Sequence, residues 1–470
     1  MRTVEDIEDE LRGAQFGDAR LSARLVSLGR SLAGSPGSSL PECIRDDGQL
    51  ECGYRFLSNR RVTPRRMLDP HHRQTFERIA RASEALAVHD TTELEFGGER
   101  QGLGPLSSGS REGFFLHTTL AVAADTSRQP LGVLAERYWV RTGQPAPKRN
   151  GRRLNGQAST KRTERESLRW AEQVRHVEAL KPTGVSLIHV GDRETDSFEM
   201  LQAVHGLRFV LRANHDRRVF ADDCALHLKQ ACERASTRCA IEVDISARKA
   251  RRQPGTSKTH PARDARVAQV GVRGLSVSIR EPYERNGKLL PIHVVHAREL
   301  EPPPDTKPVE WILYTSEPID TPAQLRRVID LYRARWVIEE FFKALKTGCE
   351  AQSLQLETYD ALCNAVSLLL PIAYKLLLLR SVGRAHPDNP ATDVLSNTQI
   401  RLLRSETRRP LPESLTVAQA MIAVAALGGY LVTKAKGPPG WITLGRGLQR
   451  LSLLETGWNA AQHLRALHDP

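Results

Sequence analysis

The order of apolar segments between residues 85 and 211 constrains the fold more than any other feature of the sequence. Three strand-like segments come first, followed by a helix, a fourth strand, a short helix and a fifth strand. In chain order these are strands 86–89, 114–124 and 132–141, helix 166–180, strand 185–190, a short helix, and strand 208–211. This order predicts an α/β fold with a mixed sheet. An acid follows the first strand (Asp90) and the fourth (Asp192).

The segments around this core differ in their periodicity. The expected domains are a helical one at 1–68, an α/β one at 69–374 with a β-rich insertion at about 216–318, and a helical one at 375–470. Apolar residues at helical spacing predict helices at 16–33 and 50–57, with basic residues between them. This pattern fits either a DNA-binding module or an ordinary helical domain with a solvated basic face. Residues 104–113 and 147–162 are expected to be loops, the second of them basic.

Charge and composition limit the class of protein. Lys and Arg number 68 against 55 Asp and Glu, which gives a net charge of +13 and favours a polyanionic partner. The seven cysteines include no CxxC pair, so a disulfide framework or a zinc ribbon is not expected, and a reducing cytoplasm fits. The N-terminus has no apolar signal segment. The apolar stretch 365–379 contains Pro371 and Lys375 and predicts a buried helix rather than a membrane anchor.

One segment, residues 331–346, combines charge with aromatic residues. If a single helix runs from about Thr321 to Lys346, a narrow stripe of it collects one acid, three cations and two aromatics. The members of the stripe are Tyr332, Arg335, Trp336, Glu339, Lys343 and Lys346. The opposite side is apolar and faces the core. A solvated, salt-bridged face is the ordinary explanation, but aromatics beside cations also suit bases and phosphates.

Three acids on separate elements fit one kind of chemistry. Asp90, Asp192 and Glu339 would supply oxygen ligands for two divalent ions, as phosphoryl transfer requires. Oxygen donors favour Mg²⁺, and Mn²⁺ is an alternative. Each acid alone is weak support, because an Asp after a strand is usually a turn former or a helix cap.

The motifs around these residues resemble those of a known family. The run Tyr332-x2-Arg335-x3-Glu339-x6-Lys346 is similar to the YREK signature of DDE transposases of the insertion-sequence-four family. The similarity extends to HDTTELEF around Asp90 and GDRETDSFEML around Asp192. Further matching segments are FGDARLSARL, GYRFLSN, RFVLRANH, WILYTSEP and, more weakly, LGGYLVTKAKGPPGW.

This resemblance implies a ribonuclease-H-like catalytic domain with Asp90, Asp192 and Glu339 as the metal-binding triad. The implied DNA contacts are Tyr332, Arg335, Lys343 and Lys346 on phosphates, Trp311 on a flipped base, Arg212 near the active site, and Tyr54 and Arg55 in the end-binding domain. The resemblance also implies that residues 375–470 mediate dimerisation.

Some assignments stay open at this point. Glu194 or Asp196 could replace Asp192, although the GDRE context favours Asp192, and Glu340 lies at the margin of the stripe. Without the resemblance, Trp311 would be read as a core residue. His89 is expected to be a strand-end histidine that hydrogen-bonds the backbone.

The sequence therefore predicts a cut-and-paste transposase that binds transposon ends and target DNA as a homodimer. It would use Mg²⁺ or Mn²⁺, cleave through a hairpin, and act in the cytoplasm at the bacterial nucleoid. One rival is a nuclease of the same fold that cuts without strand transfer. The other is a DNA-binding transposition inhibitor or a domesticated, non-catalytic remnant.

Overall fold

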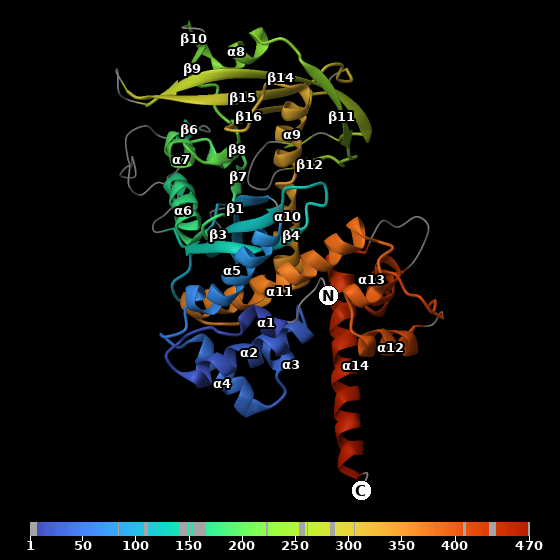
Figure 1. Ribbon diagram of the computed structural model, residues 1–470. Coiled ribbons are helices and arrows are strands. Elements are labelled where there is room, and N and C mark those ends of the chain that lie inside the picture. The colour runs from blue at the N-terminus through green and yellow to red at the C-terminus, as the bar shows by residue number, and fades with distance from the viewer. Residues whose placement is uncertain are drawn as a thin grey trace.

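The structure is a computed structural model, shown in Figure 1. It describes residues 7–82, 84–107, 111–141, 148–149, 152–153, 166–221, 224–252, 259–260, 262–282, 287–304, 306–407, 410–431 and 439–468. Most of the predicted basic loop at 147–162 and part of the LGGYLVTKAKGPPGW segment lie outside these residues.

The centre of the molecule is a mixed sheet in the predicted order of strands and helices. Its elements are β1 (Ala85–Glu95), β3 (Glu112–Ala123), β4 (Pro130–Trp139), α6 (Glu166–Leu180), β7 (Leu187–Gly191), α7 (Phe198–Val204) and β8 (Arg208–Arg212). In space the strands run β4-β3-β1-β7-β8, with β1, β7 and β8 parallel and β3 antiparallel to both β1 and β4. This arrangement confirms a mixed α/β fold and fits the expected ribonuclease-H-like domain.

Two local predictions about this sheet were wrong. The first strand does not end at Asp90 but continues to Glu95, because residues 90–95 stay paired with β3 as far as Gly113. The segment 104–113 is not entirely loop, because it contains the short strand β2 (Gly104–Pro105) and the beginning of β3. Both differences follow from pairing with β3, which local sequence does not reveal.

The segment predicted as an insertion forms strands that extend the central sheet. Strand β16 (Glu310–Thr315) pairs with β8, and the sheet continues through further strands to β10. The other elements of the insertion are β9 (Arg218–Ala221), β10 (Cys224–His227), α8 (Leu228–Arg234), β11 (Cys239–Ile245), β12 (Arg251–Arg252), β13 (Thr259–His260), β14 (Arg266–Arg280) and β15 (Leu289–Glu299). Consequently Trp311 and Arg212 lie on neighbouring strands.

Helices pack against the sheet and beneath it (Figure 1). The N-terminal set is α1 (Ile7–Leu11), α2 (Ala19–Gly34), α3 (Leu40–Cys43), α4 (Asp47–Leu57) and α5 (Pro64–Arg81), and the C-terminal set is α11 (Tyr359–Ala385), α12 (Asn397–Glu406), α13 (Val417–Leu427) and α14 (Trp441–His468). Helix α11 is long and apolar enough to cross a membrane, but 94% of its most apolar window is buried inside the protein. It is therefore a core helix, as predicted. Both α5 and α11 run across the predicted domain boundaries, so neighbouring domains share a helix.

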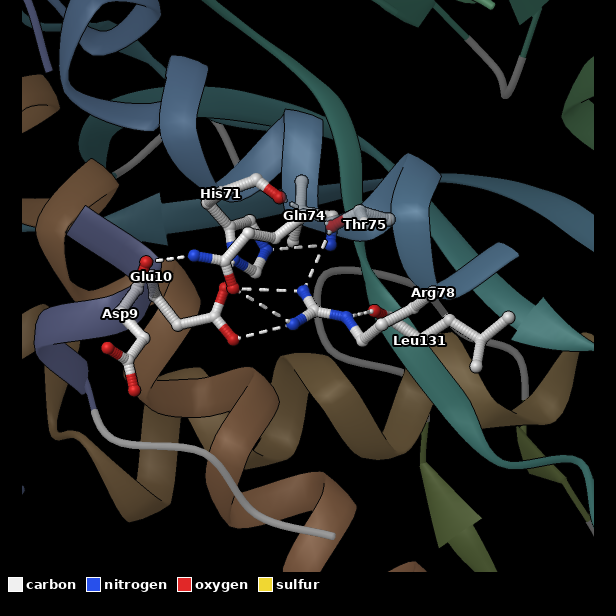
Figure 2. Close-up of polar contacts among 8 residues, drawn as sticks. Asp9, Glu10, His71, Gln74, Thr75, Arg78 and Leu131 are labelled. Atoms are coloured by element: carbon white, nitrogen blue, oxygen red, sulfur yellow. Dashed lines mark hydrogen bonds and ion pairs between the residues drawn. The ribbon is translucent and has the colours of Figure 1, made fainter. Parts of the chain in front are cut away.

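The N-terminal helices are fixed to the sheet by a buried polar network (Figure 2). Glu10 of α1 is 1% exposed and accepts hydrogen bonds from Arg78 of α5 at 2.8 and 3.2 Å. His71 of α5 donates from Nδ1 to Glu10 at 2.6 Å, since its Nε2 accepts the N–H of Val133 in β4 at 2.9 Å. Arg78 also donates to the carbonyl of Leu131. The network thus joins α1, α5 and β4 in one unit.

The predicted helix from Thr321 to Lys346 is broken into three pieces. Helix α9 (Pro322–Arg333) is followed by a tight turn, then α10 (Trp336–Lys343) and the π-helical turn η3 (Ala344–Gly348). At the first break Ile338 bonds the carbonyl of Arg335, three residues back. At the second, Cys349 bonds the carbonyl of Ala344, five residues back. These changes of hydrogen-bond period alter the regular spacing on which the predicted stripe depends.

All seven cysteines are free thiols, and three of them, Cys232, Cys349 and Cys363, are buried.

Candidate active site

Asp90 and His89 point to opposite faces of the sheet, because side chains alternate along a strand. The even-numbered neighbours Leu86 and Val88 belong to the core under α10 and α11. Asp90 therefore faces those helices, where its side chain is 13% exposed. His89 faces α6 on the other side and is fully buried.

Arg335 connects two of the three predicted catalytic acids. Its guanidinium donates to Asp90 Oδ2 at 3.2 Å and to Glu339 Oε1 at 3.4 Å. Arg335 lies in the turn between α9 and α10, and Glu339 follows one helical turn later. Arg335 thus links β1, which carries Asp90, to α10, which carries Glu339.

Asp192 lies next to Asp90 by the register of the sheet. Strands β1 and β7 are parallel, and Val88 is paired with Val190. Asp90 and Asp192 each lie two residues after that pair. Neighbouring strands are about 4.8 Å apart, so the two residues lie side by side. Burial, the Asp192 charge and, more weakly, the Glu339 charge raise the pKa of Asp90 to about 7, although Arg335 opposes the rise. Asp90 is therefore close enough to Asp192 and Glu339 for both charges to act on it.

The two alternatives to Asp192 have other surroundings. Asp196 is buried and accepts the N–H groups of Asn214 and His215 at 2.6 and 2.7 Å, so it fixes the chain after β8. Glu194 is exposed on the short helix η2 (Arg193–Thr195). Asp192 caps that helix by accepting the Glu194 N–H at 2.8 Å and leaves its second carboxylate oxygen without a hydrogen bond from the described residues.

The chemistry of the three side chains suits a hard divalent cation, but their spacing here does not form a closed site. All three side chains offer oxygen, the donor that Mg²⁺ and Mn²⁺ prefer. Among the residues that the structure describes, no three His, Cys, Asp or Glu side chains come close enough together to enclose one metal ion. Asp90 and Glu339 are instead paired with Arg335, whose positive charge balances their negative charges.

A second cluster, from β8, β16 and α9, lies beside Arg335. Arg212 donates to the Tyr332 hydroxyl at 3.3 Å, and the ring of Trp311 lies 6.4 Å from that of Tyr332. Trp311 is half-buried, but Tyr332 is only 6% exposed. The prediction that Tyr332 belongs to an open charged stripe was wrong, because the insertion strands cover this end of the helix.

The two lysines of the stripe have separate environments. Lys343 is half-exposed, donates to Glu340 at 2.8 Å and lies 5.3 Å above the ring of Trp336. Burial lowers the pKa of Lys346, and the charges of Glu93, Glu339 and Glu95 oppose that change. Glu340 is turned toward Arg380 of α11, at 3.0 Å, so it is not a fourth member of the acid group.

The sequence did not reveal a buried histidine cluster on the α6 face of the sheet. His89 contacts His189 at 2.9 Å and Thr119 at 3.1 Å, so its partners are side chains and not the predicted backbone groups. His189 contacts Glu178 of α6 at 3.0 Å, and His117 packs edge-on against Trp170. His89 was singled out from the sequence, but its partners His189 and Thr119 lie far from it along the chain.

Tyr54 and Arg55 are not near the acids. Both lie on α4, among the N-terminal helices below α11 (Figure 1). Tyr54 is half-buried, and Arg55 is exposed and paired with Glu51.

Comparison with known proteins gives two family matches and one similar structure. A transposase DNA-binding family model matches residues 5–62, and a transposase DDE domain model matches residues 176–374. The second range includes Asp192 and Glu339, and Asp90 lies before it. A cryo-EM structure of a piggyBac transposase synaptic complex with hairpin DNA is 10% identical, covers 97% of this chain and 80% of that chain, and has a TM-score of 0.34. That score is too low for the similarity to bear on fold or function.

Proposed function

The chain carries a transposase DNA-binding domain and a transposase DDE domain, and from this premise we propose that it is a cut-and-paste transposase. It cleaves transposon ends by phosphoryl transfer and joins them to target DNA. The observation that carries the proposal is the meeting of Asp90, Arg335 and Glu339 beside Asp192. We place its activity in the cytoplasm, at the bacterial nucleoid.

Asp90, Asp192 and Glu339 would hold the divalent cations, Mg²⁺ or Mn²⁺. When bound, such ions activate the attacking oxygen and stabilise the leaving oxygen of the phosphodiester. Arg335 compensates the mutual repulsion of Asp90 and Glu339 in their absence. Once the carboxylates have a different counter-charge, the guanidinium of Arg335 is free to donate to a DNA phosphate, the bidentate contact to which arginine is suited.

The remaining stripe residues would hold the DNA around the reacting phosphate. Lys343 and Lys346 supply charge on either side of Glu339, and Arg212 positions Tyr332 behind Arg335. Tyr54 and Arg55 would belong to the surface that recognises the transposon end, away from the reacting phosphate.

An end-cleavage and joining assay tests the proposal. The substrate is a labelled duplex that carries the inverted repeat found beside the coding region, with a supercoiled plasmid as target. A transposase cuts the duplex with Mg²⁺ and inserts the label into the plasmid. Cutting without insertion would indicate a nuclease of the same fold, and binding without cutting would indicate an inhibitor or remnant.

We propose further that cleavage passes through a hairpin and that Trp311 stacks on a base flipped out of its tight bend. A half-buried ring at the edge of the site can provide such stacking, which offsets part of the cost of unstacking. Trp311→Ala is expected to slow hairpin formation about tenfold more than first-strand nicking, since stacking contributes ~1–3 kcal/mol per base. Single-turnover gels resolve the two steps, with Trp311→Phe as the control that keeps an aromatic ring. Equal slowing of both steps would make Trp311 a structural residue.

We propose that α14 mediates a homodimer that forms on DNA. Its C-terminal half projects from the body of the protein (Figure 1) and exposes Leu453, Trp458 and Leu464 by 48%, 41% and 57%. Exposed apolar side chains gathered on one projecting helix are typical of an interaction surface.

Light scattering of the complex with an end duplex tests the homodimer. Two protein copies are expected per complex for the wild type, and Trp458→Glu should leave one copy. Leu289→Glu, at an equally exposed position on β15, is the control and should keep two. A two-copy complex with Trp458→Glu would place the interface elsewhere.

A further inference from the structure

A pocket rich in arginine lies beside α10, apart from the acids. Its volume is about 360 Å³, and it is lined by four arginines from three parts of the chain. Arg128 comes from the turn between β3 and β4, Arg333 ends α9, and Arg380 and Arg384 lie on α11. Glu340 is the only carboxylate among its described lining residues.

Acidic partners do not neutralise this pocket. Glu340 is shared between Arg380 at 3.0 Å and Lys343 at 2.8 Å. Asp330, outside the pocket, lies 3.6 Å from Arg333 and 3.9 Å from Arg128, which is longer than a strong ion pair. Within the described part of the chain, no carboxylate pairs with the exposed Arg384. The pocket therefore carries excess positive charge.

Keeping these charges together costs stability. Burial and then the neighbouring Arg384 lower the pKa of Arg380, against the pull of Glu340. Burial and then Arg333 lower the pKa of Arg128 in the same way. The Nε of Arg380 is also buried without a hydrogen-bond partner. An anion in the pocket would relieve the repulsion among the arginines.

The backbone at Arg128 gives a second, independent indication. Arg128 has a φ of 49°, in the left-handed region that glycine adopts without strain. A charged side chain at such a position, pointing into a pocket of like charges, is unfavourable for folding alone. Strained residues of this kind cluster at functional sites.

We propose that this arginine pocket is a binding site for a phosphodiester of the DNA backbone. Guanidinium groups bind phosphate oxygens in a bidentate manner, and the hydroxyl groups of Thr126 and Ser381 line the same pocket. Trp336, 57% exposed, also lines it. Glu340 lines the pocket and the adjacent Glu339 shares Arg335 with Asp90, so the pocket and the acids lie on adjoining sides of α10. The inference rests on the proposed function and adds a second contact to the bound DNA.

The salt dependence of DNA binding tests this site. The probe is a fluorescein-labelled duplex of about 30 base pairs of arbitrary sequence, titrated without divalent cations at about 50 to 200 mM NaCl. Two single variants remove one cation each: Arg384→Ala at an exposed position, and Arg128→Gly, which also relieves the left-handed backbone. Each is expected to make the negative slope of log K against log salt shallower by about 0.9, the value for one lost phosphate contact.

Two matched variants control for fold and charge. Arg384→Lys keeps the charge and should retain most of the slope. Arg234→Ala, exposed on the distant α8, loses an equal charge and should leave the slope unchanged. Wild-type slopes in both Arg384→Ala and Arg128→Gly, or an equal loss in Arg234→Ala, would overturn the pocket as a phosphate site. Failure of the wild type to bind the duplex would instead count against the proposed function as a whole.

Discussion

Replacing Glu339 with glutamine is expected to leave binding of the end duplex unchanged and to lower Mg²⁺-dependent cleavage by at least about 1,000-fold. The substitution keeps the size of the side chain and one oxygen but removes the negative charge. Arg335 keeps its bond to Asp90, so the turn between α9 and α10 has no reason to rearrange. Single-turnover cleavage of the labelled end duplex measures the loss, and anisotropy measures binding.

Glu233→Gln is the matched control for this experiment, because Glu233 is exposed on α8 and makes only a weak contact with Arg298 at 3.9 Å. It should cleave at the wild-type rate. Cleavage by Glu339→Gln within about tenfold of the wild type, a difference of only ~1.4 kcal/mol in the barrier, would remove Glu339 from the chemistry. That result would leave the arginine pocket untouched, since DNA binding there is measured without catalysis.

Glu10→Gln is expected to lower the free energy of unfolding by about 3–5 kcal/mol at pH 7. The change removes the Glu10 carboxylate from Arg78, whose side chain is only 14% exposed. It also replaces the acceptor of the His71 Nδ1–H by a neutral amide. Urea unfolding measures the loss, with Glu51→Gln as the control at an exposed helical pair, where the change should stay below about 1 kcal/mol.

The loss in Glu10→Gln should also depend on pH. Burial raises the pKa of Glu10, but the interactions with His71 and Arg78 outweigh it and lower the pKa to about 2, from an ordinary value of 4.5. The stabilisation is therefore fully present above pH 4.5 and is lost as the pH falls toward 2. The gap between wild type and variant should narrow through that window. A gap that stays constant with pH would show that the carboxylate charge is not the source.

Sequence order predicted much of the fold because the central elements are local and strongly periodic. Apolar runs of the right length identified the strands around Asp90 and Asp192, and parallel pairing of β1 and β7 then brings the two acids together. Glu339 was also predicted from its motif. Wheel geometry failed at Ala334 and Arg335, where three-residue hydrogen bonds break the helix. The exposure of Tyr332 was misjudged for a different reason, because strands distant in sequence cover that end of α9.

Features that depend on distant pairing could not be read from local pattern. The insertion extends the central sheet because β16 pairs with β8, which lies about 100 residues earlier in the chain. His89 meets His189, and Arg128 meets Arg380, through folding alone. Such long-range contacts leave no periodic pattern in the sequence. The role of a single residue, by contrast, can be predicted from the motif around it.

The buried Glu10 network has a consequence for how a cut site would be chosen. The network ties α1 and α5 to β4, and β4 is joined through β3 to β1, which carries Asp90. If the N-terminal helices recognise the transposon end, as proposed, we expect the protein to hold a fixed length of duplex between the recognised bases and the severed bond. Adding one base pair between them, about 3.4 Å of rise, should move the break by one nucleotide along the DNA and leave its distance from the recognised bases unchanged.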